Sequence, residues 1–148
     1  MLIIETESIN EARKQIEKSN KEGKKIAVLG RGIEFNRIIL ENKKVSMLIL
    51  SHENKKDKLK QRDSGLNHIL CEIARKNSIT FAFDLNELIK QNDKKQKALI
   101  LARIIQNIKL IKKFKNNFKI INYQNKQQAF SFLLSLGLPT DMAKEAVN

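Results

Sequence analysis

Short apolar runs alternate along the chain with longer stretches in which apolar residues recur at helical spacing. The apolar runs predict buried strands at residues 2–4, 25–29, 45–50, 79–83 and 118–121. The amphipathic stretches predict helices at residues 9–20, 33–42, 66–76, 85–91, 94–115, 125–136 and 140–147. Strands that alternate with helices predict an α/β fold with a parallel sheet of βα units. A closed eight-stranded barrel needs about 250 residues, so the pattern leaves an open doubly wound sheet and part of a barrel as alternatives.

The length and composition are those of one globular domain, which we predict to span residues 1–148. No Pro-, Gly- or Ser-rich linker divides the chain. The one cysteine, Cys71, cannot form an internal disulfide, and the longest uninterrupted apolar run, at residues 98–102, is far shorter than a membrane span of about 20 residues. Because the N-terminus also lacks the apolar core of a signal peptide, we expect a cytoplasmic protein.

The chain is strongly basic, since 29 Lys and Arg residues face 16 Asp and Glu residues and give a net charge of +13. A charge of this size favours a polyanionic partner, with nucleic acid ahead of an acidic membrane surface, although a Lys-rich genome would also produce it. Most of the excess lies in residues 90–119, where Asp93 is the one acidic residue. With one Tyr and no Trp in the chain, a folded RNA or a duplex backbone is a better fit than stacked single strands.

Polar and basic side chains share part of the surface of the helix predicted at residues 94–115. A projection at 100° per residue places the apolar residues on one arc and a polar set on the remainder. The polar set is Arg103, Gln106, Asn107, Lys109 and Lys113. These residue types donate hydrogen bonds to phosphate and sugar, so we interpret the set as an RNA-contacting surface, with an ordinary solvated helix face as the alternative.

A basic turn, RDSG at residues 62–65, directly precedes the helix predicted at residues 66–76. Asp and Ser are good helix caps, so the turn has a structural explanation in which either residue caps that helix. The predicted structural turn consists of Asp63, Ser64 and Gly65. The helix cap leaves three residues unexplained, and these are candidates for contact with RNA or a partner protein: Arg62, Asn67 and His68.

Side chains for metal or nucleophilic catalysis are few. The two histidines, His52 and His68, lie in different predicted elements, and no HxH, HxxxH or CxxC spacing occurs, so we expect no metal site. Cys71 follows His68 at i, i+3 spacing, but it lies beside the apolar arc, where a free cysteine is usually a core residue. The GRG turn at residues 30–32 lacks the full GxGxxG phosphate motif. We therefore predict no catalytic residue.

Three stretches carry a more specific pattern: RDSGLNHIL at residues 62–70, ARKNSITFAFDLNELI at residues 74–89 and RIIQNIKLIKKFK at residues 103–115. In this order they resemble ribonuclease P protein component 3, the archaeal relative of the eukaryotic thirty-kilodalton subunit. The resemblance implies a TIM-barrel-like fold related to the polymerase-histidinol phosphatase superfamily, here shortened at the N-terminus to a truncated or partial barrel. A shortened barrel would leave a sheet edge or an apolar face open, which we expect a partner chain or a second copy to cover.

The same resemblance implies the function. It implies an RNA-binding, non-catalytic subunit of ribonuclease P that supports RNA-catalysed removal of the 5′ leader from precursor tRNA. The implied partners are ribonuclease P RNA and component 2, the Pop5-like subunit, with precursor tRNA contacted indirectly. No cofactor is implied for this chain, since Mg2+ would belong to the RNA subunit. The alternatives are a metal-dependent phosphoesterase of the wider superfamily and a degenerate relative that serves as an interaction module.

Overall fold

The structure, a computed structural model, describes residues 1–52 and 63–148, and these contain all the predicted strands and helices. The strands are β1 (Leu2–Ile4), β2 (Ile26–Leu29), β3 (Met47–Leu50), β4 (Thr80–Asp84) and β5 (Phe118–Ile121). The helices are α1 (Ile9–Lys21), α2 (Ile33–Leu40), α3 (His68–Lys76), α4 (Leu85–Ile89), α5 (Lys94–Phe114), α6 (Lys126–Ser135) and α7 (Thr140–Ala146). The pattern of apolar positions is therefore sufficient to place the secondary structure.

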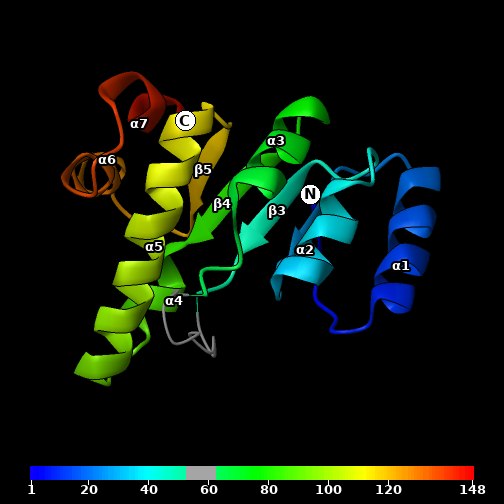
Figure 1. Ribbon diagram of the computed structural model, residues 1–148, viewed down its shortest axis with the longest axis horizontal. Coiled ribbons are helices and arrows are strands. Elements are labelled where there is room, and N and C mark those ends of the chain that lie inside the picture. The colour runs from blue at the N-terminus through cyan, green and yellow to red at the C-terminus, as the bar shows by residue number, and fades with distance from the viewer. Residues whose placement is uncertain (53–62) are drawn as a thin grey trace.

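The five strands form one parallel sheet in which neighbours in space are also neighbours along the chain (Figure 1). The order β1-β2-β3-β4-β5 never reverses, whereas a doubly wound sheet reverses at a switch point. Because parallel crossovers are almost always right-handed, a sheet whose order never reverses carries its crossover helices on one side. The predicted α/β fold of parallel βα units is confirmed, and the strand order is that of a partial barrel.

The main core lies between the sheet and the helices. Leu48 and Leu50 of β3 and Phe81 and Phe83 of β4 are buried on this side and belong to a cluster that includes side chains of the helices. Burying one such side chain stabilises the fold by about 1.5–3 kcal/mol. This face of the sheet therefore fixes the positions of the helices that carry the polar and basic residues.

The alternate residues of the same strands point to the opposite face of the sheet. They form a second, smaller apolar cluster of Ala27, Ile49 and Ala82, with Leu29, Met47 and Ile121 packed against it. Every member of this cluster lies on a strand, and no helical side chain among the described residues belongs to it. In a closed barrel this face would be the interior, and we refer to it as the inner face.

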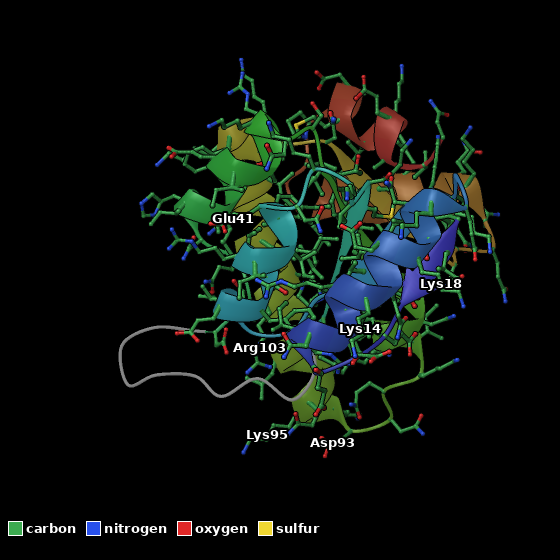
Figure 2. All side chains as sticks on the ribbon, turned by 90° about the vertical axis from the view of Figure 1, so that its right-hand side faces the viewer. Lys14, Lys18, Glu41, Asp93, Lys95 and Arg103 are labelled. Carbon is green, nitrogen blue, oxygen red and sulfur yellow. The ribbon has the colours of Figure 1, made fainter. Side chains whose placement is uncertain are left out.

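Helix α5 begins at an efficient N-cap. The side chain of Asp93 accepts hydrogen bonds from the backbone N–H groups of Lys95 at 2.8 Å and Gln96 at 3.3 Å. Asp93 and Lys95 lie at the lower end of the view in Figure 2, with Arg103 above them. The first turn of α5 has no acidic residue, so Asp93 is the carboxylate that balances the positive end of the helix dipole.

Replacing Asp93 by Ala should lower the free energy of unfolding by about 1 kcal/mol, because two backbone N–H groups lose their partner. Asp93→Asn keeps the capping oxygen and should lower the free energy of unfolding by only a few tenths of a kcal/mol. Urea denaturation followed by circular dichroism measures both. Equal losses in the two variants would mean that charge, and not capping, is what Asp93 supplies.

Candidate nucleic-acid interface

Two buried polar side chains of α5 connect this helix to the segments on both sides of residues 53–62. Arg103 is 4% exposed, and its Nε donates to the carbonyl of Asp63 at 3.1 Å while its Nη1 donates to the carbonyl of His52 at 3.3 Å. Asn107, one turn further along, is 1% exposed and donates from Nδ2 to the carbonyl of Ser64 at 3.0 Å. We call Arg103 and Asn107 the α5 clamp.

His52 lies at the centre of this junction, directly after β3. Its Nε2 lies 3.0 Å from Asn107 Nδ2, and because that amide nitrogen can only donate, Nε2 is the acceptor. The ring proton is then on Nδ1, which lies 3.4 Å from a carboxylate oxygen of Glu87. The other oxygen of Glu87 accepts from the backbone N–H of His52 at 2.5 Å. The carboxylate, the imidazole and the amide therefore form one connected chain of hydrogen bonds from α4 to α5.

Asn36 makes a second connection, between the GRG turn and the RDSG turn. Its Oδ1 accepts from the backbone N–H of Arg31 at 2.7 Å, and its Nδ2 donates to the carbonyl of Gly65 at 2.8 Å. A Cβ at Gly30 would lie 2.9 Å from Asn36 Oδ1 and 3.0 Å from the carbonyl oxygen of Ile49, so only glycine fits there. Since Asn36 already uses the N–H of Arg31, the GRG turn is a packed corner rather than an open phosphate cradle.

The RDSG turn has its own internal support. The carboxylate of Asp63 accepts from the backbone N–H of Gly65 at 3.1 Å, and Gly65 has a φ of 75°, a conformation that favours glycine. The prediction that Asp63 or Ser64 caps the following helix is wrong. Helix α3 begins at His68, and its N-cap is Asn67, whose side chain accepts from the backbone N–H of Leu70 at 3.0 Å.

The predicted orientation of α5 is wrong at two positions. Arg103 and Asn107 were expected on the exposed surface, but both are buried. The buried stripe consists of Ile100, Arg103, Ile104, Asn107, Ile108 and Ile111. This spacing is the regular i, i+3, i+4, i+7 pattern of a packed helix face, and that regularity is the signal that could have identified the two residues. Their partners are backbone carbonyls of His52, after β3, and of the RDSG turn, which require donors rather than apolar side chains.

The other predicted contact residues lie at the surface or outside the described part. His68, Lys109 and Lys113 are exposed, Asn67 is half-buried and Gln106 is half-buried with Nε2 3.4 Å from Ser64 Oγ. Arg62 lies outside the residues that the structure describes. Of the predicted contact residues, His68, Lys109 and Lys113 are therefore exposed and accessible to a partner.

A set of exposed basic side chains gathers where the C-terminal ends of α3 and α5 lie together. The two helices pack against each other, and Arg75 Nη1 lies 3.5 Å from the carbonyl oxygen of Phe114. The set, which we call the basic end, is Arg75, Lys76, Lys109, Lys112, Lys113 and Lys115. Helix α5 contains no acidic residue and α3 contains only Glu72. Cations are favoured at helix C-termini by the helix dipole, and here they also form one extended positive surface.

Cys71 and His68 do not form a catalytic pair. Cys71 is buried in the main core, while His68 is exposed at the start of α3. Burial raises the pKa of the Cys71 thiol to about 12, and the carboxylate of Glu72 contributes in the same direction. The thiol is therefore protonated at neutral pH and serves as a packing residue.

Within residues 1–52 and 63–148, no group of three or more His, Cys, Asp or Glu side chains is placed to hold a metal ion. Over the same residues, no helix combines the length and the apolar character needed to cross a membrane.

Replacing Arg103 by Met should lower the free energy of unfolding by about 3 kcal/mol, because the buried backbone carbonyls of His52 and Asp63 lose a charged donor. Lys113→Met removes the same charge from an exposed position of the same helix and should change stability by less than about 0.5 kcal/mol. Urea denaturation at matched m-values compares the two. Similar losses in both variants would show that Arg103 acts through charge alone.

The Cys71 thiol should react with a disulfide reagent at pH 8 about 10³-fold more slowly in the native protein than in urea, because a thiolate forms only far above that pH. The rate in the native state should be unchanged by His68→Ala. A fast native reaction that the His68 substitution slows would contradict the structural assignment of Cys71.

No family model matches the chain, but individual proteins do. The chain is 29% identical over 111 residues to a curated protein named Ribonuclease P protein component 3 from Methanococcus maripaludis strain C7. It is 30% identical over 111 residues to the protein of the same name from strain C6. Both matches cover 75% of this chain and 45% of the relative, so the chain spans just under half the length of these relatives.

A solved structure gives the same fold. A chain in the cryo-EM structure of archaeal Ribonuclease P with mature tRNA matches with a TM-score of 0.76 and 24% sequence identity, covering 97% of this chain and 62% of that chain. At this identity the likeness establishes the fold, and the sequence matches supply the relationship. Over three quarters of its length the chain is similar in sequence to ribonuclease P protein component 3, which confirms the resemblance predicted from its sequence.

Proposed function

We propose that the chain acts as an RNA-binding protein subunit of ribonuclease P and supports RNA-catalysed removal of the 5′ leader from precursor tRNA. The observation that carries this proposal is the sequence match over 111 residues to two curated component 3 proteins. The net charge of +13 supports a polyanionic partner independently of that match.

The partners in this proposal are ribonuclease P RNA and component 2, the Pop5-like subunit, with precursor tRNA contacted indirectly. The chain itself holds no cofactor, and Mg2+ belongs to the RNA subunit. The chain is not catalytic alone, and it works in the cytoplasm.

The residues proposed to contact RNA or a partner protein are Arg62, Asn67, His68, Lys109 and Lys113. Lys109 and Lys113 project from the basic end, which has the extended positive surface that a phosphate backbone requires. Arg103 and Asn107 take a different role, because both are buried and donate to backbone carbonyls. They position the RDSG turn, and with it the start of α3, relative to the basic end.

Replacing Lys109 and Lys113 by Ala together should reduce the slope of log affinity against log salt by about 1.8 on a duplex region, since each neutralised phosphate contributes about 0.9. The matched control is Lys14→Ala with Lys18→Ala, which removes the same charge from α1 (Figure 2). Helix α1 packs against β1 and β2, and helix α5 lies near the opposite end of the strand order (Figure 1). Filter binding to ribonuclease P RNA at several salt concentrations measures the slopes, and an equal reduction in both variants would mean that the charge acts without a defined surface.

Reconstitution tests the function itself. The chain and component 2, added to the cognate RNA at low Mg2+, should raise the rate of precursor tRNA cleavage above that with RNA and component 2 alone. The Lys109 and Lys113 double variant should lose much of this stimulation, and the α1 control should keep it. Absence of stimulation by the unaltered chain would reject the proposal, as would metal-dependent cleavage of a generic phosphoester by the chain without RNA.

A further inference from the structure

The side-chain amide of Asn107 uses its nitrogen twice and its oxygen not at all. Nδ2 donates to His52 Nε2 at 3.0 Å and to the carbonyl of Ser64 at 3.0 Å. Oδ1 is buried and has no hydrogen-bond partner among the described residues. Buried polar groups are nearly always hydrogen-bonded, so the reason for this exception must lie in what surrounds the amide.

One neighbour of the amide can change from an acceptor to a donor. His52 is 1% exposed, and its Nε2 can accept from Asn107 only while the imidazole is neutral. Histidine is the side chain whose charge ordinarily changes between about pH 5 and pH 8. A proton on Nε2 would place two donors 3.0 Å apart, and the unused Oδ1 of the same amide is an acceptor that would remove this conflict.

The junction around His52 contains a charge that can stabilise the protonated ring. Glu87 of α4 has a carboxylate oxygen 3.4 Å from Nδ1, and its side chain is 11% exposed, so a buried imidazolium would have an anionic partner. The Arg103 guanidinium of α5 opposes that charge, and it donates to backbone carbonyls of the junction. The RDSG turn contributes the carboxylate of Asp63, which accepts a hydrogen bond within the turn. Strand β4 contributes the uncharged ring of Phe83, whose centroid lies 5.5 Å from that of the imidazole in an edge-on contact.

Turning the amide over has a consequence for the RDSG turn. Oδ1 would take the position of Nδ2, which lies 3.0 Å from the carbonyl oxygen of Ser64. Two oxygens that can only accept would then face each other, so the Ser64 carbonyl would lose its donor and move away from α5. The hydrogen bonds of the turn to Asn36 and Arg103 do not involve the imidazole ring. The displacement is therefore centred on Ser64.

We propose that His52 and Asn107 form a proton-operated latch on the RDSG turn. With the imidazole neutral, Asn107 keeps the Ser64 carbonyl against α5. Protonation of Nε2 turns the amide, so that Oδ1 accepts from the ring and the carbonyl is released. The turn leads into α3, which begins with the N-cap Asn67 and the exposed His68, so the latch sets the position of these two residues. The latch goes beyond the proposed function, since it does not require that the chain bind RNA.

Nuclear magnetic resonance of the isotope-labelled chain between about pH 8 and pH 5 tests the latch. At the upper pH the nitrogen shifts of His52 should show a neutral ring with its proton on Nδ1. On acidification Nε2 should gain a proton, and the carbonyl carbon of Ser64 should lose the shift of a hydrogen-bonded carbonyl with the same midpoint.

Asn116 supplies an internal control for this titration. Its Nδ2 donates to the carbonyl of Cys71 at 2.8 Å, and its Oδ1 is also buried without a partner among the described residues. No histidine shares this amide within the described part of the chain. The carbonyl carbon of Cys71 should therefore keep its shift over the whole pH range.

Two variants fix the latch in opposite states. His52→Gln can present an amide oxygen in place of Nε2 but gains no proton, so the Ser64 carbonyl should stay bonded and become independent of pH. Asn107→Asp supplies acceptors and no donor, so the Ser64 carbonyl should have its released shift already at about pH 8. The titration of the unaltered chain does not depend on the folding of either variant.

Protonation of His52 with no change at Ser64 would overturn the proposal. A ring that stays neutral down to the pH at which the protein unfolds would also overturn it, as would equal movement of the Ser64 and Cys71 carbonyl signals, which would indicate general unfolding by acid. None of these measurements involves RNA, so their failure is separate from failure of the reconstitution assay.

Discussion

Burial of the Arg103 guanidinium between the segment after β3 and the RDSG turn is the interaction on which the arrangement of the polar residues depends. A charged group can be taken out of water only where its donors find acceptors, and here the carbonyls of His52 and Asp63 serve. These two carbonyls lie on either side of residues 53–62. One side chain therefore fixes the separation of two chain segments, and Asn107 repeats the contact one helical turn away through Ser64.

This anchoring connects two surfaces that the sequence separates by about 40 residues. The RDSG turn leads directly into α3, and the C-terminal end of α3 packs beside the C-terminal end of α5. Helix α5 thus contacts α3 near both ends: the clamp acts on the turn before α3, and Arg75 in the last turn of α3 reaches the carbonyl of Phe114. These contacts hold the backbone that carries the basic end, and a backbone already in place loses less entropy on binding than one that must be ordered.

The secondary structure follows from the sequence because apolar periodicity is a local property of each segment. The strand order follows less directly, since consecutive and reversed orders use the same alternation of strands and helices, and only the family resemblance favoured the barrel form. The regular spacing of the buried stripe on α5 could have placed Arg103 and Asn107 inside, but it could not name their partners, because Arg and Asn are the same residue types whether they donate to a phosphate or to a buried carbonyl. Cys71 was correctly assigned to the core since its neighbours Leu70 and Ala74 are apolar and buried, a local signal of the kind that sequence patterns preserve.

The carboxyl ends of parallel strands are the usual place for a ligand in α/β folds. In this chain the ends of β2 and β3 are occupied by the protein itself, through Asn36 and the chain of hydrogen bonds from Glu87 to His52 to Asn107. That occupation moves the available binding surface to the outside of the helices, where the basic end lies. The inner face is separate from it, on the other side of the sheet. The two faces of the sheet therefore offer separate surfaces, one packed by the helices that carry the basic end and one lined by strand residues alone among the described residues.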